Sequence, residues 1–473
     1  MIQKSAMQLN RVKPFNLKLK VPYLSASKKV TQTLTKDRRF GTDGIRGPVD
    51  STMNPLFVTK LGWAAGSVLK EEGISRVLIG KDTRISGYML ESALQAGFIS
   101  AGMDVTLLGP LPTPGVAYLA KENNQAGVVI SASHNLFEDN GIKFFDRNGH
   151  KFSSDLEQRI ELKITQPILT SKSIELGKAT RLTDAQELYI NFCKSSVEGI
   201  DLSGLSLLLD CANGATYSIA PKVFEDLGAT VTKISAEPDG ININQNCGST
   251  NPDNLLKAMK GKDYDLGIAF DGDGDRILVV GKSGKILDGD DLLYLLTLNK
   301  ETSLDNFGVV GTLMTNKALE NYFEQSGCNF IRAEVGDKYV LDELLKNNWF
   351  IGGEPSGHII CLDSSSTGDA VIAALKVLEC IKKDSFDVEE SLKDFIKYPQ
   401  TLINIKVADV NKVIMNASFR SSLKDIECQL GSEGRVLIRP SGTEPLIRIM
   451  VESKNSDLAE EYARKLADLA ALV

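Results

Sequence analysis

The feature that most constrains the fold is a pattern that occurs three times along the chain. In each copy an apolar strand is followed by a helix and a second strand, and a later strand ends in a polar loop. The copies comprise 76–79, 87–102, 104–108 and 126–130; then 205–210, 219–228, 230–234 and 264–270; and finally 308–314, 317–327, 328–335 and 349–353. Strands that alternate with helices predict parallel α/β layers, and their continuous apolar character predicts burial on both faces. Because the copies are unevenly spaced, we expect three domains of similar topology and not a solenoid.

The C-terminal part of the chain follows a different pattern. Apolar strands are expected at 435–439 and 446–453, and an amphipathic helix follows, with Ser456 as its expected N-cap. This pattern predicts a small α+β domain. The expected division is a basic extension at 1–36 and domains at 37–187, 188–290, 291–402 and 403–473.

Charge is unevenly distributed along the sequence. Residues 1–39 contain ten of the 54 Lys and Arg but only one of the 61 Asp and Glu, which leaves 44 basic and 60 acidic side chains in the remainder. An acidic body is not expected to attract nucleic acid. No apolar segment approaches the ~20 residues of a membrane helix. Seven Cys without a CxxC pair favour a reducing compartment. We therefore expect a soluble, cytoplasmic protein that binds neither nucleic acid nor membrane.

The polar loop that ends the second copy contains aspartates at alternate positions, Asp271, Asp273 and Asp275. Alternate side chains of an extended segment point to the same side, so these carboxylates can converge on one ion. Hard oxygen ligands without nearby His or Cys favour Mg²⁺. An EF-hand would need Gly and Glu where this loop has Arg276 and Lys282. A solvated Asp–Gly turn is the other interpretation, but clustered carboxylates repel one another without a cation, so we predict a metal site.

Ser133, in the loop that ends the first copy, is the candidate nucleophile. No G-x-S-x-G elbow of a serine hydrolase surrounds it. His134 adjoins it, and neighbours in an extended chain point to opposite faces, so His134 is expected to be a poor general base for Ser133. The HExxH motif and the GxxxxGK[ST] phosphate loop are absent as well. Taken alone, this segment fits a turn better than a nucleophile.

Two further polar loops carry groups that suit phosphate and hydroxyl ligands. The residues concerned are Arg439, Ser441, Gly442, Thr443 and the nearby Arg448 in one loop region, and Glu354, Ser356 and His358 in the other. Arginine forks match phosphate oxygens, although an ordinary hairpin with surface arginines fits the first loop equally well. A polar, Gly-rich turn is the simpler interpretation of the second.

Taken together, these loops and several other segments resemble the α-D-phosphohexomutase family. The segments, in order, are 40–47 (FGTDGIRG), 81–87 (KDTRISG), 130–135 (ISASHN), 139–145 (DNGIKFF), 210–216 (DCANGAT), 242–250 (NINQNCGST), 271–276 (DGDGDR), 335–340 (VGDKYV), 352–358 (GGEPSGH) and 439–448 (RPSGTEPLIR). The resemblance covers residues 38–473 and is strongest to the bacterial branch that acts on glucosamine phosphate. It implies four domains around a central cleft, three of them α/β with mixed, mainly parallel sheets, and a small C-terminal α+β domain.

The resemblance also implies roles for individual residues. Ser133 would carry a phosphoryl group, and Ser133, Asp271, Asp273 and Asp275 would hold one Mg²⁺ per subunit. Catalytic roles near the reacting atoms would fall to Arg46, Lys143 and Arg276, with Lys143 as an acid/base whose pKa is lowered by cationic neighbours. Glu354, Ser356 and His358 would contact the sugar, and the phosphate that is not reacting would be held by Arg439, Ser441, Gly442, Thr443 and Arg448.

The activity implied by the resemblance is that of a phosphosugar mutase. It would interconvert glucosamine 6-phosphate and glucosamine 1-phosphate, with glucosamine 1,6-bisphosphate as intermediate and activator, and so supply UDP-N-acetylglucosamine synthesis. Glucose or mannose phosphates are alternative substrates, and a phosphatase, in which water attacks phospho-Ser133, is an alternative activity. Position 355 is Pro, where related mutases have Met, Gln or Asn. Because Pro changes the backbone of the loop expected to contact the sugar, the resemblance predicts the sugar less sharply than it predicts the reaction. The partner would be a small hexosamine phosphate, and a homodimer is one assembly that we consider.

Overall fold

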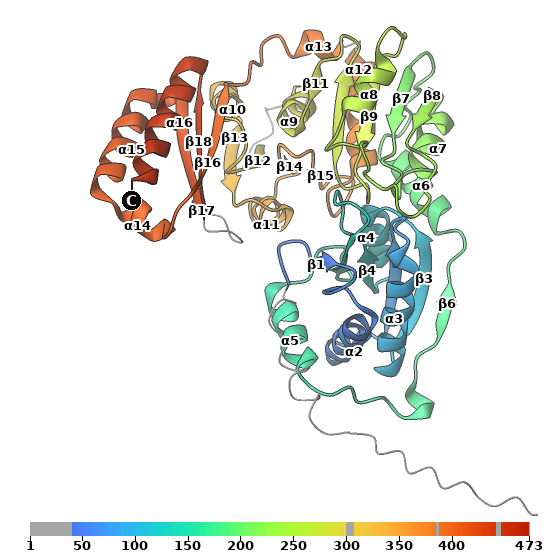
Figure 1. Ribbon diagram of the computed structural model, residues 1–473. Coiled ribbons are helices and arrows are strands. Elements are labelled where there is room, and N and C mark those ends of the chain that lie inside the picture. Colours follow the sequence, from blue (N-terminus) through green and yellow to red (C-terminus); the bar gives the residue numbers. More distant parts are fainter. Residues whose placement is uncertain (1–39, 299–306, 385–386, 441–445, 473) are drawn as a thin grey trace, which may run out of the picture. The chain divides into compact units, whose positions relative to one another are not determined.

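The computed structural model describes residues 40–298, 307–384, 387–440 and 446–472 (Figure 1). The basic extension at 1–36 lies outside the described residues. Four β-sheets organise the described chain, and their strands follow one another along the sequence, sheet by sheet. In the described part of the chain, every helix is too short or too polar to cross a lipid bilayer.

The first sheet has six strands in the order β1-β5-β4-β2-β3-β6. Its strands are β1 (Ile45–Pro48), β2 (Arg76–Lys81), β3 (Asp104–Pro110), β4 (Ala126–Ile130), β5 (Asp139–Phe145) and β6 (Ala179–Arg181). Its helices are α2 (Pro55–Glu71), α3 (Ser86–Ser100), α4 (Thr113–Glu122) and α5 (Ser154–Ile164), and α6 (Ala185–Ser195) follows β6. Strands β3, β2 and β4 are parallel, whereas β5 is antiparallel to both β4 and β1.

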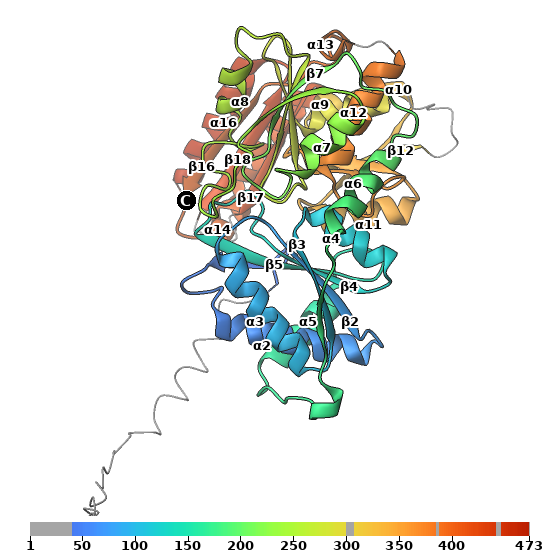
Figure 2. The same ribbon diagram turned by 90° about the vertical axis from the view of Figure 1, so that its right-hand side faces the viewer.

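Helices cover both faces of this sheet because its central strands are apolar on both sides. Helices α2, α3 and α5 share one apolar cluster with alternate residues of β2 and β4, such as Ile79 and Val128, and Figure 2 shows α2 and α3 side by side. Helices α4 and α6 belong to the other cluster, together with Leu78 and Val129. The alternation of consecutive strand residues between the two clusters is what a strand buried on both faces requires.

The second and third sheets repeat the central part of the first. The second has the order β11-β10-β9-β7-β8 and the third β13-β12-β14-β15. The elements of the second are β7 (Ser206–Asp210), α7 (Ile219–Asp226), β8 (Thr230–Ile234), α8 (Asp253–Met259), β9 (Leu266–Phe270), β10 (Ile277–Gly281) and β11 (Ile286–Leu287). Those of the third are α9 (Gly289–Thr297), β12 (Gly308–Thr312), α10 (Lys317–Ser326), β13 (Asn329–Ala333), α11 (Asp337–Asn347), β14 (Ile351–Gly353), β15 (Ile359–Cys361), α12 (Ala370–Asp384) and α13 (Val388–Ser391).

The predicted threefold repetition is confirmed by strand pairing. In each sheet the first strand of the repeat lies between the second and the third and is parallel to both: β2, β7 and β12 occupy this place. In each sheet an antiparallel strand then pairs with the third strand of the repeat. The three α/β domains therefore share one topology, with mixed sheets.

The fourth sheet is antiparallel throughout and small, as the sequence predicts. Its order is β16-β18-β17, with β16 (Gln400–Lys406), β17 (Gly434–Pro440) and β18 (Leu446–Ser453), and its helices are α14 (Val410–Met415), α15 (Ala417–Leu430) and α16 (Ser456–Ala471). The expected N-cap of α16 is wrong by one residue. Asn455, and not Ser456, caps this helix, because the Asn455 side chain accepts hydrogen bonds from the backbone of Asp457 and Leu458.

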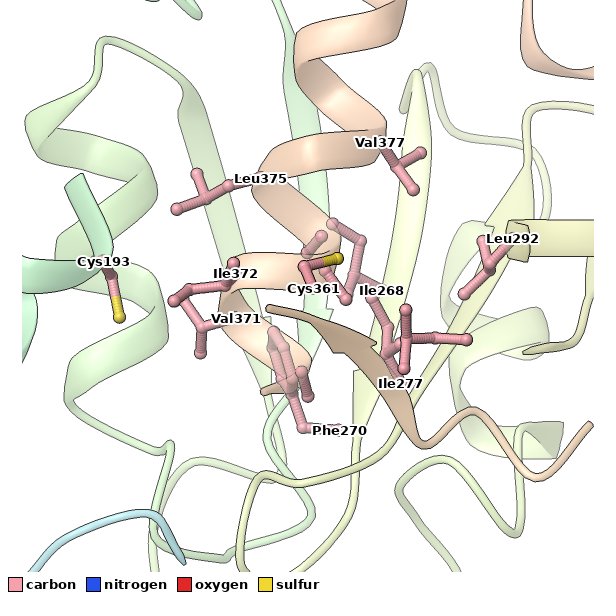
Figure 3. Packing of buried hydrophobic residues seen from close by; sticks show 14 of the residues in the cluster. Cys193, Ile268, Phe270, Ile277, Leu292, Cys361, Val371, Ile372, Leu375 and Val377 are labelled. Carbon is pink, nitrogen blue, oxygen red and sulfur yellow. The ribbon is translucent and has the colours of Figure 1, made fainter. Parts of the chain in front are cut away.

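The second and third domains share a continuous apolar core, and the first domain contributes to it through residues such as Val129 of β4. In Figure 3, Val371, Ile372 and Leu375 of α12 face this core, near Ile268 of β9 and Cys361 of β15. Helix α12 therefore covers strands that precede it by a hundred residues, and its burial ties the third domain to the second. The polar loops that end β4, β9 and β14 consequently project from sheets with a shared, fixed core.

Candidate active site

Ser133 is fully buried and held by hydrogen bonds at both its backbone and its side chain. Its Oγ donates to Asp271 Oδ2 at 2.6 Å, which joins the loop after β4 to the loop after β9. Its backbone N–H donates to Ser131 Oγ at 2.9 Å, and its φ is +53°, in the left-handed region that L-residues rarely adopt. The hydroxyl is therefore fixed toward the aspartate loop.

His134 lies closer to Ser133 than the sequence predicts. Its Nδ1 is 3.4 Å from Ser133 Oγ, so the expectation that the two side chains point to opposite faces is wrong. The reason is the left-handed backbone of Ser133, which breaks the alternation of an extended segment. Burial, followed by the positive charges of Arg276 and Arg46, lowers the pKa of His134 to about 4, so this imidazole is neutral at pH 7.

The three aspartates after β9 converge as predicted and are almost completely buried. One oxygen of each of Asp271, Asp273 and Asp275 lies within 4.8 Å of the others. Two of their oxygens, Asp273 Oδ1 and Asp275 Oδ1, have no hydrogen-bond partner in the described residues. A buried carboxylate oxygen without a partner is costly. The triad thus offers converging hard oxygen atoms that could hold a divalent cation.

Lys143 forms ion pairs with the Oδ2 atoms of two aspartates of this triad. Its Nζ lies 2.7 Å from Asp273 Oδ2 and 3.0 Å from Asp275 Oδ2, and its side chain is almost fully buried. Burial by itself would lower the pKa of Lys143, but the negative charges of Asp273 and Asp275 outweigh it and raise the pKa. The expectation of a lowered pKa is therefore wrong: Lys143 has carboxylates as its direct neighbours and is a fixed cation at neutral pH.

Two arginines add positive charge beside the same carboxylates. Arg46, on β1, forms an ion pair with Asp43, and Arg276 Nε lies 3.9 Å from Asp275 Oδ1. The Nε atoms of both arginines are buried and have no hydrogen-bond partner in the described residues. These donors are free to contact an anion.

A cavity of about 630 Å³ opens beside these residues. It is lined by Thr42, Asp43, His134, Asp275, Arg276, Met314, Val335, Gly336, Asp337, Glu354, Pro355, Ser356, His358 and Arg448, which come from all four domains. The predicted site residues Arg276, Glu354, Ser356, His358 and Arg448 are therefore brought together by the fold. Arg439 pairs with Arg448 across β17 and β18, while Ser441, Gly442 and Thr443 lie outside the described residues.

Glu354 and His358 are positioned by contacts with neighbouring elements. Glu354 Oε1 accepts a hydrogen bond from the backbone N–H of Gly336 at 3.0 Å. His358 lies between Asp337, at 3.4 Å from Nε2, and Asp275, at 3.8 Å from Nδ1. Burial opposes protonation of His358, but the charges of Asp337 and Asp275 outweigh it and raise the pKa.

Sequence reasoning missed one group at this site, a network of charges centred on Lys151. Lys151 Nζ contacts Asp43, and lies 2.6 Å from Asp337 Oδ2. Asp43 also contacts Lys143 Nζ at 3.1 Å, so the network reaches the aspartate triad. Asp43 and Asp337 lie in two of the segments that carry the family resemblance, 40–47 and 335–340, and this was the available signal.

Comparisons with known proteins identify the family. Models of the four phosphoglucomutase/phosphomannomutase domains match in order: the α/β/α domain I at residues 37–169, domain II at 187–284, domain III at 288–398 and the C-terminal domain at 402–469. The chain belongs to the phosphoglucomutase/phosphomannomutase family.

Individual relatives agree with this family membership. A curated protein of Alcanivorax borkumensis named phosphoglucosamine mutase is 49% identical over 433 residues, which cover 91% of this chain and 98% of the relative. A phosphoglucomutase/phosphomannomutase family structure from Burkholderia thailandensis has a TM-score of 0.79 at 23% identity and covers 92% of this chain and 98% of its own. The Aspergillus fumigatus N-acetylphosphoglucosamine mutase, solved with GlcNAc-6P and magnesium, has a TM-score of 0.67 at 16% identity, with 94% and 99% covered. These two structures share the four-domain fold of the family.

Loss of the Lys151 charge should destabilise the protein more than loss of the charge of Lys338, which is partly exposed and forms an ion pair nearby. Replacing Lys151 by Met (Lys151→Met) leaves the negative charges of Asp43 and Asp337 with one positive neighbour fewer. We therefore expect the free energy of unfolding to fall by about 2–4 kcal/mol. Lys338→Met is the matched control, since Lys338 pairs with Glu157 between α11 and α5, and should cost about 1 kcal/mol or less. Urea denaturation would measure both, and equal losses would contradict a special role for the buried network.

Proposed function

We propose that this chain is a phosphosugar mutase that interconverts glucosamine 6-phosphate and glucosamine 1-phosphate through a phosphoserine at position 133. The observation that carries the proposal is the 2.6 Å contact between Ser133 Oγ and a buried aspartate triad at a cavity edged by Arg276 and Arg448. The choice of sugar is supported by the Alcanivorax borkumensis relative named phosphoglucosamine mutase, at 49% identity over 91% of the chain.

The aspartate triad fits Mg²⁺ in charge and in free ligand atoms. Asp273 and Asp275 each direct Oδ2 to Lys143, and their Oδ1 atoms accept no hydrogen bond within the described residues; Asp271 lies beside the serine. We propose that Asp271, Asp273, Asp275 and the phosphate on Ser133 hold one such ion. When bound, it would neutralise and polarise phosphoryl oxygens.

Transfer would begin from phospho-Ser133. A sugar hydroxyl oxygen bonds to phosphorus while the bond from phosphorus to Ser133 Oγ breaks. Overall the proton of that hydroxyl passes to Ser133 Oγ, so the products are glucosamine 1,6-bisphosphate and the free serine hydroxyl. Arg46, Lys143 and Arg276 supply fixed positive charge around the phosphoryl group, and such stabilisation is the main contribution of a protein to this chemistry. In the dephosphorylated protein Ser133 Oγ donates to Asp271 Oδ2, which fixes the direction of the hydroxyl for the return step. In that step Ser133 Oγ bonds to phosphorus and its proton passes, overall, to the departing sugar oxygen.

The bisphosphate would then turn round and return its other phosphoryl group to Ser133. In both orientations Glu354, Ser356 and His358 would contact the sugar hydroxyls. The second phosphate would be held by Arg448 together with Arg439, Ser441, Gly442 and Thr443. A homodimer, a cytoplasmic location and activation by the bisphosphate stay predictions.

Substrate comparison tests the proposed sugar. With the 6-phosphates of glucosamine, glucose and mannose, we expect the highest kcat/KM for glucosamine 6-phosphate, by roughly 10- to 100-fold, since few contacts distinguish these sugars. Some activity with glucose 6-phosphate is expected. A higher kcat/KM for mannose 6-phosphate would favour a phosphomannomutase, and steady release of inorganic phosphate would favour a phosphatase.

Removal of the Ser133 hydroxyl should abolish turnover without unfolding the protein. Ser133→Ala deletes the group that bonds to phosphorus, and we expect kcat to fall by several orders of magnitude. Peptide mass spectrometry of the unaltered protein should find phosphate on Ser133. The exposed Ser195→Ala serves as control and should leave both activity and phosphorylation unchanged. Mutase activity near the normal level in Ser133→Ala would refute the phosphoserine.

Activity should also depend on a divalent cation held by the triad. Asp273→Asn keeps the side-chain shape but removes one negative charge, so it should raise the Mg²⁺ concentration needed for half-maximal activity and lower kcat. Asp263→Asn, at an exposed acid that pairs with Lys282, should change neither quantity. Undiminished activity after exhaustive chelation would contradict the metal site.

A further inference from the structure

We propose that Asn244, together with Arg84, is a positioning residue that holds Ser133 in its left-handed conformation and thereby sets the rate of phosphoryl transfer. The inference rests on the proposed role of Ser133 as the phosphorylated residue. Asn244 lies in the loop between β8 and α8 of the second domain, whereas Ser133 and Arg84 belong to the first. Asn244 would therefore align the serine of one domain with the aspartates of the other.

The conformation of Ser133 needs external support. Its φ of +53° costs a non-glycine residue about 1–2 kcal/mol relative to ordinary backbone. Such strained residues persist where the surrounding structure over-determines them. In this conformation the Ser133 hydroxyl reaches Asp271, so relaxation of the backbone would move the reacting oxygen.

The support acts on backbone carbonyl oxygens. Ser133 O accepts hydrogen bonds from Asn244 Nδ2 at 2.8 Å and from Arg84 Nη2 at 2.9 Å. The same two donors also bond Asn135 O, at 2.9 and 2.8 Å respectively. Arg84 is itself oriented by Asp82, which accepts from Arg84 Nε at 2.9 Å. Two side chains from different domains thus hold the turn at two of its carbonyls.

The Asn244 amide is committed to this turn. Its nitrogen must face the two carbonyl oxygens, because an amide oxygen placed there would repel them. Its Oδ1 is buried and has no partner in the described residues, so the hydrogen bonds of this side chain go to Ser133 and Asn135. Burying an unpaired oxygen is unfavourable. This cost indicates that the two hydrogen bonds donated by Nδ2 compensate for the unpaired Oδ1 of Asn244.

Close packing at Gly272 reinforces the same contact. A Cβ added at Gly272 would lie 2.6 Å from Ser133 O and 2.7 Å from Asn244 Nδ2. Gly272 is located between Asp271 and Asp273, so the carbonyl of Ser133 rests directly on the aspartate loop. The clamp formed by Asn244 and Arg84 therefore fixes the distance between the serine and the triad, and its hydrogen bonds to the turn do not involve Glu354, Ser356 or His358.

Variants at Asn244 test the clamp by separating its donor function from its shape. Asn244→Ala removes the donor, and Asn244→Asp keeps the shape but places oxygen against both carbonyls. We expect kcat to fall roughly 10- to 100-fold in Asn244→Ala and further in Asn244→Asp, with KM for glucosamine 6-phosphate within about twofold of normal. Transfer of labelled phosphate from glucosamine 1,6-bisphosphate to Ser133, followed in a single turnover, should slow in parallel.

The same substitutions at Asn246 control for the energetic cost of replacing Asn at a position with left-handed backbone. Asn244 has a φ of +57°, and Asn246, in the same loop, has a φ of +54°, but the side chain of Asn246 is exposed. Asn246→Ala and Asn246→Asp should keep kcat near normal. If Asn244→Asp is more active than Asn244→Ala, the residue only fills space and the clamp is refuted. If both match the Asn246 pair while the unaltered protein carries phosphate on Ser133, the clamp is refuted and the proposed function stands. Absence of that phosphate would overturn both.

Discussion

The hydrogen bond between Ser133 and Asp271 is the contact on which the arrangement of the site depends. It joins a loop of the first domain to a loop of the second and lies in a fully buried position. Each loop has an unfavourable feature: the serine has strained backbone, and the triad collects three carboxylates in a buried space. Each loop supplies what the other lacks, because the serine donates a hydrogen bond to a carboxylate that would otherwise be buried with one oxygen unpaired.

Charge compensation extends this arrangement to the third domain. Lys143 pairs with Asp273 and Asp275, and Asp43 links Lys143 to Lys151, which reaches Asp337. Isolated buried charges are prohibitive, whereas an alternating network of opposite charges is tolerated. The network therefore requires the first, second and third domains to be present together.

Much of the fold could be predicted from the sequence, because continuous apolar strands that end in polar loops are a local signal. The strands from Arg76 onward and the convergence of the aspartates at Asp271–Asp275 follow from it. What local patterns could not provide is the identity of neighbours from other domains. The pKa of Lys143 was misjudged because its carboxylate neighbours lie more than a hundred residues away, and the proximity of His134 was missed because a single left-handed residue breaks alternation.

The distribution of burial suits a substrate that must turn round within one site. Ser133 and the triad are at most 4% exposed, so the reacting end is shielded from water. Ser356 and Arg448, at the recognition end of the same cavity, are exposed. A buried reacting centre protects a phosphoserine from hydrolysis, because it limits the access of water to the phosphoryl group. An open recognition end can accept either phosphate of a bisphosphate in turn. The proposed mechanism needs both properties at once, and in this fold they come from different domains: the reacting groups from the first and second, and the exposed contacts from the third and fourth.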